Sequence, residues 1–184
     1  MEFDKSYGNV PKKFRDWILG LFIVFTVFLM FRVAIVNGDS MNPTLENKNL
    51  LIVDKMLYKF SKQPIKRGDI LILKANIHGK NKVLVKRVIG LPNDKIEIKS
   101  NRLYINNKYI QENYIDSTDY RDVKETIVSQ KSYFVLGDNR ANSLDSRHNK
   151  LGCISEKNIV GKVKYSIGLK SFSNNIKELD LDGK

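Results

Sequence analysis

Histidine and cysteine are nearly absent from this sequence, which excludes several common designs of active site. The single cysteine, Cys153, has no partner for a disulfide within the chain and rules out a zinc site built from cysteines. We expect Cys153 to be a small buried apolar residue. Of the two histidines, His78 lies in the polar run IHGKNK and His148 in a segment with a different interpretation. Neither is therefore a good base for a Ser-His-Asp triad.

Acidic residues are too few to balance the basic ones. The 184-residue chain has 32 Lys and Arg against 20 Asp and Glu, a formal net charge of +12. This excess suggests an anionic partner, either nucleic acid or a membrane surface, although we favour the simpler interpretation of a lysine-rich solvated surface. No aromatic-basic RNA motif or zinc finger accompanies the charge, so we expect no nucleic-acid partner. The 42% hydrophobic content suffices for one folded domain with a short appendage.

Charge is almost missing from one long stretch near the N-terminus. Residues 17–36 carry a single charge, Arg32, close to the end of the stretch. Their length matches the span of about 20 residues that a bilayer crossing needs, and they are apolar on every face. Basic residues precede them and acidic residues follow, so the positive-inside rule places the N-terminus in the cytoplasm. We predict a cytoplasmic segment at 1–16, a single transmembrane anchor at 17–36 and an extracytoplasmic β-rich domain at 37–184.

Two other interpretations of residues 17–36 are open. A cleavable secretory signal also combines a basic start with an apolar stretch, but this stretch is long for that role and no small-x-small cleavage site follows it. A buried helix of a soluble domain would normally carry an amphipathic stripe, which is missing here. Both are therefore weaker than the anchor.

Helix signals are sparse after residue 37, and the chain is instead divided into short apolar runs bounded by Gly, Pro, Asn or Asp. The pair Asn106-Asn107 predicts a tight hairpin turn. We also expect a helical turn at 57–59, a long polar loop or an excursion from the sheet at 113–125, and a polar, frayed tail from 171. The predicted fold class is one N-terminal transmembrane helix followed by a mostly antiparallel β domain. The expected strands are 49–54, 69–73, 82–89, 95–98, 102–105 and 133–136.

The first of three polar segments with possible chemistry is GDSMNPTL, residues 38–45. Its Gly, Asp and Pro residues predict a turn around Ser40. A turn presents the serine hydroxyl together with neighbouring backbone N–H groups, which is what acyl transfer requires of a nucleophile and its oxyanion donors. An ordinary solvated turn explains the segment better when it is considered alone.

The second segment contains a candidate base for a serine nucleophile. Lys86 lies within a strand-like run between apolar neighbours. If its side chain points inward, burial lowers its pKa and makes a neutral amine available, and alternation along the strand turns Arg87 outward. The pattern alone favours the opposite orientation, with Lys86 in solvent and Arg87 inward, because most lysines are exposed.

The third segment, residues 137–147, is dense in polar side chains. Asp145 and Arg147 are two residues apart, a spacing suited to an ion pair within a loop. Ser143 and Ser146 add hydroxyl groups that could hold an amine. A charged surface loop is the alternative.

Together the three segments resemble the motifs of a known family. GDSMNPTL resembles the serine box of bacterial type I signal peptidases, KRVIGLPND their lysine box and GDNRANSLDSR their C-terminal box, in the same order after an apolar anchor. The resemblance extends from the anchor to about Lys162, and the short single-anchor form is similar to the Gram-positive type. It implies an antiparallel β domain of the signal-peptidase type and a membrane-bound serine endopeptidase that removes signal peptides from exported preproteins, cleaving after small residues.

The resemblance also implies roles for individual residues. Ser40 would be the nucleophile and Lys86 the general base of a mechanism that needs no metal or cofactor. Ser143 would orient the lysine amine, and Asp145 and Arg147 would form a structural ion pair. The partners would be the signal peptides of preproteins and membrane lipids; the oligomeric state is left open. The pockets for small substrate side chains would be lined by Val36, Asn37, Met41, Leu45, Leu84 and Val85.

Two positions depart from the family's pattern. Many members have a serine at the position of Gly38, whose hydroxyl is an oxyanion donor, so here either a backbone group completes the oxyanion hole or the hole is weaker. Asn93 replaces a glycine that is common in the lysine box. Asparagine tolerates positive φ, so we expect that turn to survive.

Two further interpretations compete with a signal peptidase. A self-cleaving Ser-Lys protease of the repressor type would be cytosolic, which the apolar segment argues against. A non-catalytic relative that serves as an assembly factor would lack the serine or the lysine, and both are present.

Overall fold

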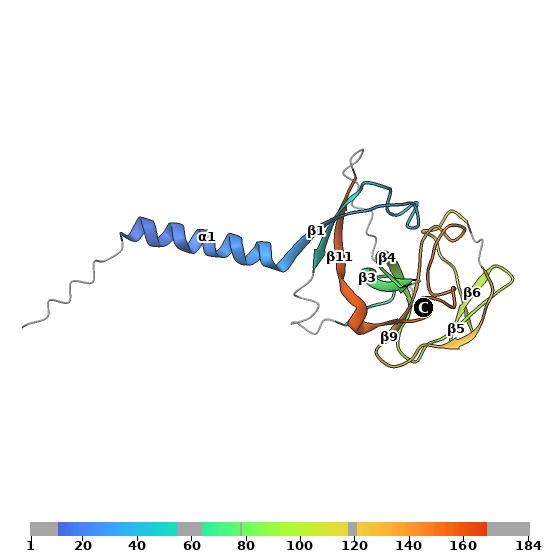
Figure 1. Ribbon diagram of the computed structural model, residues 1–184. Helices are drawn as coiled ribbons and strands as arrows, with labels where there is room; N and C mark the ends of the chain where they lie inside the picture. Colours follow the sequence, from blue (N-terminus) through green and yellow to red (C-terminus); the bar gives the residue numbers. More distant parts are fainter. Residues whose placement is uncertain (1–10, 55–63, 78, 118–120, 169–184) are drawn as a thin grey trace, which may run out of the picture.

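A computed structural model describes residues 11–54, 64–77, 79–117 and 121–168. One α-helix, α1 (Lys12–Met30), extends away from a body made of β-strands (Figure 1). None of the described helices combines the length and apolar character required to cross a membrane. The helical turn expected at 57–59 and the tail expected from 171 lie outside the described residues.

The predicted anchor is not one helix throughout. The helix ends at Met30, and β1 (Phe31–Ile35) follows it directly, so the helical boundary expected at 36 is wrong. β1 pairs antiparallel with β2 (Leu50–Asp54), with Val33 opposite Ile52. A continuous apolar run cannot by itself separate helix from strand. Here the distant β2 supplies the backbone partners of the last residues.

The larger sheet has seven strands in the order β1-β2-β11-β3-β4-β9-β10, and every pairing is antiparallel. Its two long central strands, β3 and β4, form a hairpin. A short 3₁₀ helix (Glu156–Asn158) precedes β11. The remaining strands are β3 (Ile70–Ile77), β4 (Lys80–Gly90), β9 (Ser132–Leu136), β10 (Ile154–Ser155) and β11 (Ile159–Ile167).

The smaller sheet has four strands in the order β7-β6-β5-β8. Asn106 and Asn107 have φ of 52° and 68°, which confirms the predicted tight turn between β6 and β7. The loop expected at 113–125 is wrong at its end, because residues from Val123 onward pair with β5. The strands are β5 (Lys95–Lys99), β6 (Arg102–Ile105), β7 (Lys108–Ile110) and β8 (Val123–Ile127).

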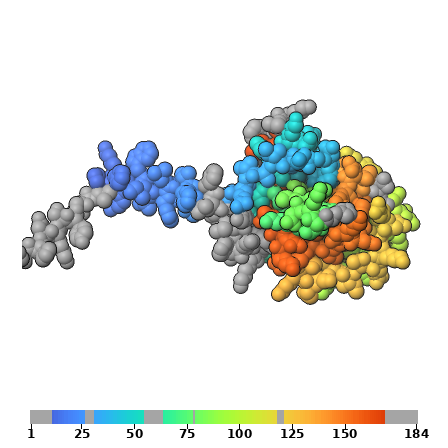
Figure 2. Space-filling view, in the orientation of Figure 1, coloured from blue at the N-terminus to red at the C-terminus, as the bar shows by residue number. Residues whose placement is uncertain are grey.

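All six strands expected from the sequence are present within these two sheets, which confirms a mostly antiparallel β domain. The turn of the lysine box also survives: Asn93 has φ of 72°, and its backbone N–H donates to the carbonyl of Val128. Figure 2 shows the strands as one rounded body with α1 apart from it.

Three hydrophobic clusters fill this body. One lies between the sheets and includes Ile89 and Phe134 from the large sheet with Ile96 from the small one. Another packs Met41 and Leu45, from the segment after β1, against β2 and β3. The third lies around Leu71, Leu73 and Val88. The segment that contains Ser40 is therefore attached to the core by its own apolar side chains.

Candidate active site

Ser40 lies in the predicted turn, in the connection that follows β1. The backbone N–H of Asn42 donates to the carbonyl of Asp39 at 3.1 Å, which closes the turn around Ser40. Met41 and Leu45 are each only 1% exposed and hold the turn against the core. Gly38 precedes the turn with φ of +105°, and its N–H donates to Asn47 Oδ1 at 3.2 Å. A positive φ here suits glycine, which has no Cβ to clash with the backbone.

Lys86 points into the molecule, which is the inward one of the two orientations compatible with the sequence. It lies on β4 opposite Leu71 and is 2% exposed. Its Nζ is 2.6 Å from Ser40 Oγ, within hydrogen-bond distance. Burial lowers the pKa of Lys86 to about 8, although the nearby carboxylates of Asp145 and Asp138 oppose this change. The amine can therefore lose its proton near neutral pH.

The expectation that Arg87 faces solvent is wrong. Both faces of β4 are covered at this point, and Arg87 is only 4% exposed. Its guanidinium forms a two-point ion pair with Asp138, at 2.9 Å for Nε–Oδ1 and 2.6 Å for Nη2–Oδ2. The same guanidinium donates to Thr44 Oγ1 and to the carbonyl of Gly68, each at 3.1 Å. Arg87 thus links the lysine strand to the serine segment.

The segment after β9 lies directly against the serine turn. The N–H of Asn139 donates to the carbonyl of Ser40 at 3.1 Å, and its side-chain amide donates to the carbonyl of Asp39 at 3.2 Å. A Cβ added at Gly137 would lie 2.4 Å from the oxygen of that same Ser40 carbonyl and 2.1 Å from Ser143 Oγ. Only glycine allows this close approach.

The predicted ion pair of Asp145 and Arg147 is present and buried. Nε–Oδ1 and Nη2–Oδ2 are each 2.9 Å, and Asp145 Oδ2 also accepts from the N–H of Gly137 at 3.0 Å. Burial alone would raise the pKa of Asp145, but the hydrogen bonds and charge of Arg147 hold it below its ordinary value. The pair therefore fixes the segment that approaches Ser40.

The two serines of the third segment have different surroundings. Ser146 Oγ accepts a hydrogen bond from the N–H of Val135 at 2.9 Å, so it supports β9 rather than an amine. Ser143 Oγ is buried and has no partner with good hydrogen-bond geometry among the described residues, Lys86 included, although its side chain is near enough to Asp145 to help lower the pKa of that carboxyl. Its role in orienting the amine stays a prediction.

The six residues expected to line the pockets are not all brought together. Asn37 is exposed, and Leu84 packs against a different cluster, the one around Leu71. The pocket role of the whole set stays a prediction. The four that share one cluster beside the serine turn are Val36, Met41, Leu45 and Val85.

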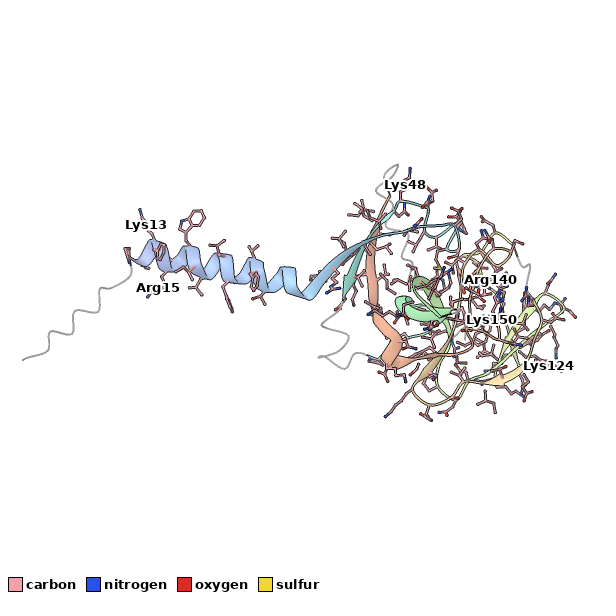
Figure 3. All side chains as sticks on the ribbon, viewed as in Figure 1. Lys13, Arg15, Lys48, Lys124, Arg140 and Lys150 are labelled. Atoms are coloured by element: carbon pink, nitrogen blue, oxygen red, sulfur yellow. The ribbon has the colours of Figure 1, made fainter. Side chains whose placement is uncertain are left out.

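Sequence reasoning missed three residues beneath this site. Arg140, labelled within the β body in Figure 3, donates from Nε to the carbonyl of Gly137 at 2.8 Å and forms an ion pair with Glu112. Tyr114 lies beside both arginines, with its ring centroid 4.1 Å from Cζ of Arg87. Arg140 belongs to the third polar segment and could have been considered there. Glu112 and Tyr114 lie in or next to a stretch interpreted as a plain polar loop, and no sequence signal marks them.

The arrangement combines a nucleophile with a base. Ser40 and Lys86 are in contact, the lysine is buried, and two ion pairs fix the segments around them. No group of His, Cys, Asp and Glu side chains within the described ranges is suited to hold a metal ion. The chemistry that such a pair supports is acyl transfer through a serine ester.

The known proteins with similar sequences described below are all named as signal peptidases. Residues 15–167 match the family model described as signal peptidase, peptidase S26. A crystal structure of a signal peptidase I from Enterococcus faecalis superposes with a TM-score of 0.48 at 27% identity, over 55% of this chain and 98% of that one. Signal peptidase I of Bacillus caldolyticus is 41% identical over 164 residues, which cover 81% of this chain and 86% of that protein. Signal peptidase I P of Bacillus subtilis subsp. natto is 43% identical over 174 residues, which cover 86% and 91%. From the family model and these relatives, the chain belongs to the signal peptidase family, peptidase S26, and is a peptidase of the signal peptidase I type.

Proposed function

We propose that this protein removes signal peptides from exported preproteins, with Ser40 as nucleophile and Lys86 as general base. The observation that carries the proposal is the 2.6 Å distance between Lys86 Nζ and Ser40 Oγ. The lowered pKa of Lys86, about 8, supports it, because a base must be neutral to accept a proton.

The proposed reaction has two stages. Neutral Lys86 takes the proton of Ser40 Oγ, and Oγ bonds to the scissile carbonyl carbon. The C–N bond then breaks, the leaving amine receives the proton from the Lys86 ammonium, and an ester on Ser40 remains. Lys86 next takes a proton from a water molecule, which attacks the ester and releases the signal peptide, while Ser40 recovers its proton. We assign the backbone N–H of Ser40 as a donor to the oxyanion in both stages.

Small-residue specificity is part of the proposal. Val36, Met41, Leu45 and Val85 form an apolar cluster beside the serine turn. Shallow apolar pockets accept alanine-sized side chains and exclude larger ones by overlap. A substrate with small residues before the cleaved bond fits this surface best.

We also propose that α1 holds the enzyme at the membrane, with the N-terminus in the cytoplasm and the β domain outside. Large apolar side chains on successive turns of α1 are exposed, including Trp17 at 74%, Leu21 at 64% and Phe22 at 65%. Burial of this surface in lipid would remove it from water. Lys13 and Arg15 lie at the end of α1 far from the β domain (Figure 3), where they can meet headgroups. An enzyme held in the plane of its inserted substrate gains effective concentration.

The test is cleavage of a preprotein with an Ala-x-Ala site by the detergent-solubilised full chain. Wild type should cut after the second Ala, as read from the mass of the product, whereas Ser40→Ala and Lys86→Ala should not cut. Activity in either purified variant would remove that residue from the mechanism. If wild type leaves the preprotein intact, removal of signal peptides of this general kind is not its function.

A further inference from the structure

We infer that Glu112 and Tyr114, from the connection between β7 and β8, are positioning residues that keep Lys86 aligned with Ser40 and shielded from water. The inference rests on the proposed function, because it concerns the same pair of residues. The effect of Glu112 and Tyr114 passes through two arginines that hold the segments on which Ser40 and Lys86 lie.

Glu112, Tyr114, Arg87 and Arg140 form a network of two layers. The first layer is the buried ion pair of Arg140 and Glu112, to which Tyr114 is hydrogen-bonded. The side chains of Arg140 and Glu112 are 0% and 1% exposed. Arg140 Nη2 donates to Glu112 Oε1 at 2.8 Å, and a second guanidinium nitrogen meets the other carboxylate oxygen. The Tyr114 hydroxyl donates to the same carboxylate. Burial and the neighbouring Glu112 raise the pKa of Tyr114, so this hydroxyl keeps its proton.

The second layer is Arg87 against the ring of Tyr114. Cζ of Arg87 lies 4.1 Å from the ring centroid, a cation–π contact, and Cζ of Arg140 lies 5.8 Å from the same centroid. Two like charges are thereby placed on one ring. Asp138 compensates Arg87, and Glu112 compensates Arg140. Loss of either carboxylate would leave an uncompensated buried guanidinium.

The network reaches both members of the catalytic pair. Arg140 Nε holds the carbonyl of Gly137, in the segment whose Asn139 N–H binds the carbonyl of Ser40. Arg87 is the neighbour of Lys86 on β4 and donates to Thr44 in the serine segment. Loosening Tyr114 and Glu112 would therefore release the serine and the lysine sides together.

A role in stability alone does not account well for this arrangement. Buried ion pairs contribute little net stability, because removing both charges from water costs about as much as their attraction returns. What they do provide is a fixed geometry. The groups that face Lys86 are Ser40 and the charged side chains of Asp145, Asp138 and Arg147, and burial is the largest influence on its pKa. If the network loosens and water enters, that pKa rises toward its ordinary value.

The experiment compares Glu112→Gln and Tyr114→Phe with a matched pair on the small sheet, Glu97 and Tyr104, whose side chains are only partly buried. Like Glu112 and Tyr114, Glu97 and Tyr104 form an ion pair and a cation–π contact with a basic side chain. Lys99 is 3.1 Å from the carboxylate of Glu97 and 5.1 Å from the ring centroid of Tyr104. Glu97→Gln and Tyr104→Phe should keep the wild-type profile of kcat/KM against pH. The two network variants should lose about tenfold in kcat/KM near pH 7.5 and recover most of it at about pH 10, because the base now titrates about one unit higher. Equal loss at every pH, or no loss, would overturn the inference.

A second measurement reads the pKa of Lys86 without any substrate. The unfolding free energy of the full chain in detergent is measured against pH with Lys86 present and with Lys86→Met, in the wild-type and Glu112→Gln backgrounds. In the wild-type background, the difference in unfolding free energy between the protein with Lys86 and the Lys86→Met variant should change from about pH 8 upward. In the Glu112→Gln background, it should change only from about one pH unit higher. The same profile in both backgrounds would overturn the positioning role even if wild type cleaves the preprotein. A shifted profile would support it even if cleavage, and with it the proposed function, fails.

Discussion

Lys86 is held in a position where its charged form is unfavourable, and this has a measurable cost in stability. Its pKa of about 8 in the folded protein compares with 10.5 for an unperturbed lysine. Between these pH values the unfolded chain binds more protons than the folded one, so the free energy of unfolding rises with pH across this window. Below about pH 8 the folded protein has the full penalty, on the order of 3 kcal/mol.

Replacement of Lys86 by methionine should remove this penalty. We predict that Lys86→Met is more stable than wild type at pH 7 and that the advantage disappears by about pH 10.5. Urea unfolding of the two proteins at several pH values, followed by far-UV circular dichroism, measures the advantage and its loss. Parallel stability curves for the two proteins would contradict a depressed pKa.

The same titration should control the rate. We predict that kcat/KM rises about tenfold per pH unit below about 8 and then levels off, because only the neutral amine accepts the proton of Ser40. Lys86→Arg should be inactive throughout, since a guanidinium does not deprotonate in this range. A profile that is flat from about pH 6 to 10 would exclude a lysine base.

Gly137 is a further single-residue test of the geometry. A Cβ at this position would lie 2.4 Å from the carbonyl oxygen of Ser40, a backbone atom that cannot rotate away. We predict that Gly137→Ala loses most activity and some stability. Addition of Ser143→Ala should not restore activity, because the backbone clash remains. Gly20→Ala, where a Cβ meets nothing within 4 Å, is the matched control. Wild-type kinetics in Gly137→Ala would mean that the serine turn is not held this closely.

At the scale of elements, strands with clear boundaries could be predicted, whereas features that depend on a distant partner could not. The sequence pattern of β2 and the asparagine turn after β6 depend on local residues alone, and the structure confirms both predictions. β1 became a strand only because β2 pairs with it. Arg87 was assigned to solvent because alternation assumes one covered face, but Asp138 and Tyr114 cover the other.

The segment after β9 illustrates the same distinction for the site. The pairing of Asp145 with Arg147 was predictable from their spacing, and the energetic consequence follows from their burial. We predict that Arg147→Ala lowers the unfolding free energy by about 3–5 kcal/mol, because it leaves Asp145 as an uncompensated buried charge. The loss of activity should be smaller when measured on the fraction that remains folded.

The control for Arg147→Ala is an ion pair at the surface. Lys95 and Glu125 are 2.9 Å apart with side chains 29% and 55% exposed, so Lys95→Ala should cost less than about 1 kcal/mol. Thermal unfolding of the two variants separates the cases. Normal melting of Arg147→Ala together with complete loss of activity would make Arg147 a functional residue rather than a structural one.

At the scale of the whole molecule, we propose that the boundary between α1 and β1 separates attachment to the membrane from folding of the β domain. β1 follows Met30 without a linker and occupies an edge of the large sheet, where Phe31 to Ile35 pair with β2. The apolar helix before it makes few contacts with the strands and extends away from them (Figure 1). Removal of α1 should therefore leave the sheet intact, while removal of β1 exposes the backbone groups of β2.

Two truncations test this boundary. A chain that begins at Phe31 should leave the membrane fraction, fold, and cleave a soluble peptide with a kcat near that of the full chain, although a membrane-inserted preprotein should be cut more slowly because the shared plane is lost. A chain that begins at Asn37 should be markedly less stable, because β1 and the packing of Val36 in the serine cluster are missing. Fractionation after an alkaline wash, urea unfolding and peptide cleavage measure the three properties. If the Phe31 chain stays with membranes, the β domain itself binds lipid, and α1 is not the sole anchor. If the two truncated chains are equally stable, β1 belongs with the anchor, as the uninterrupted apolar run suggested, and not with the sheet.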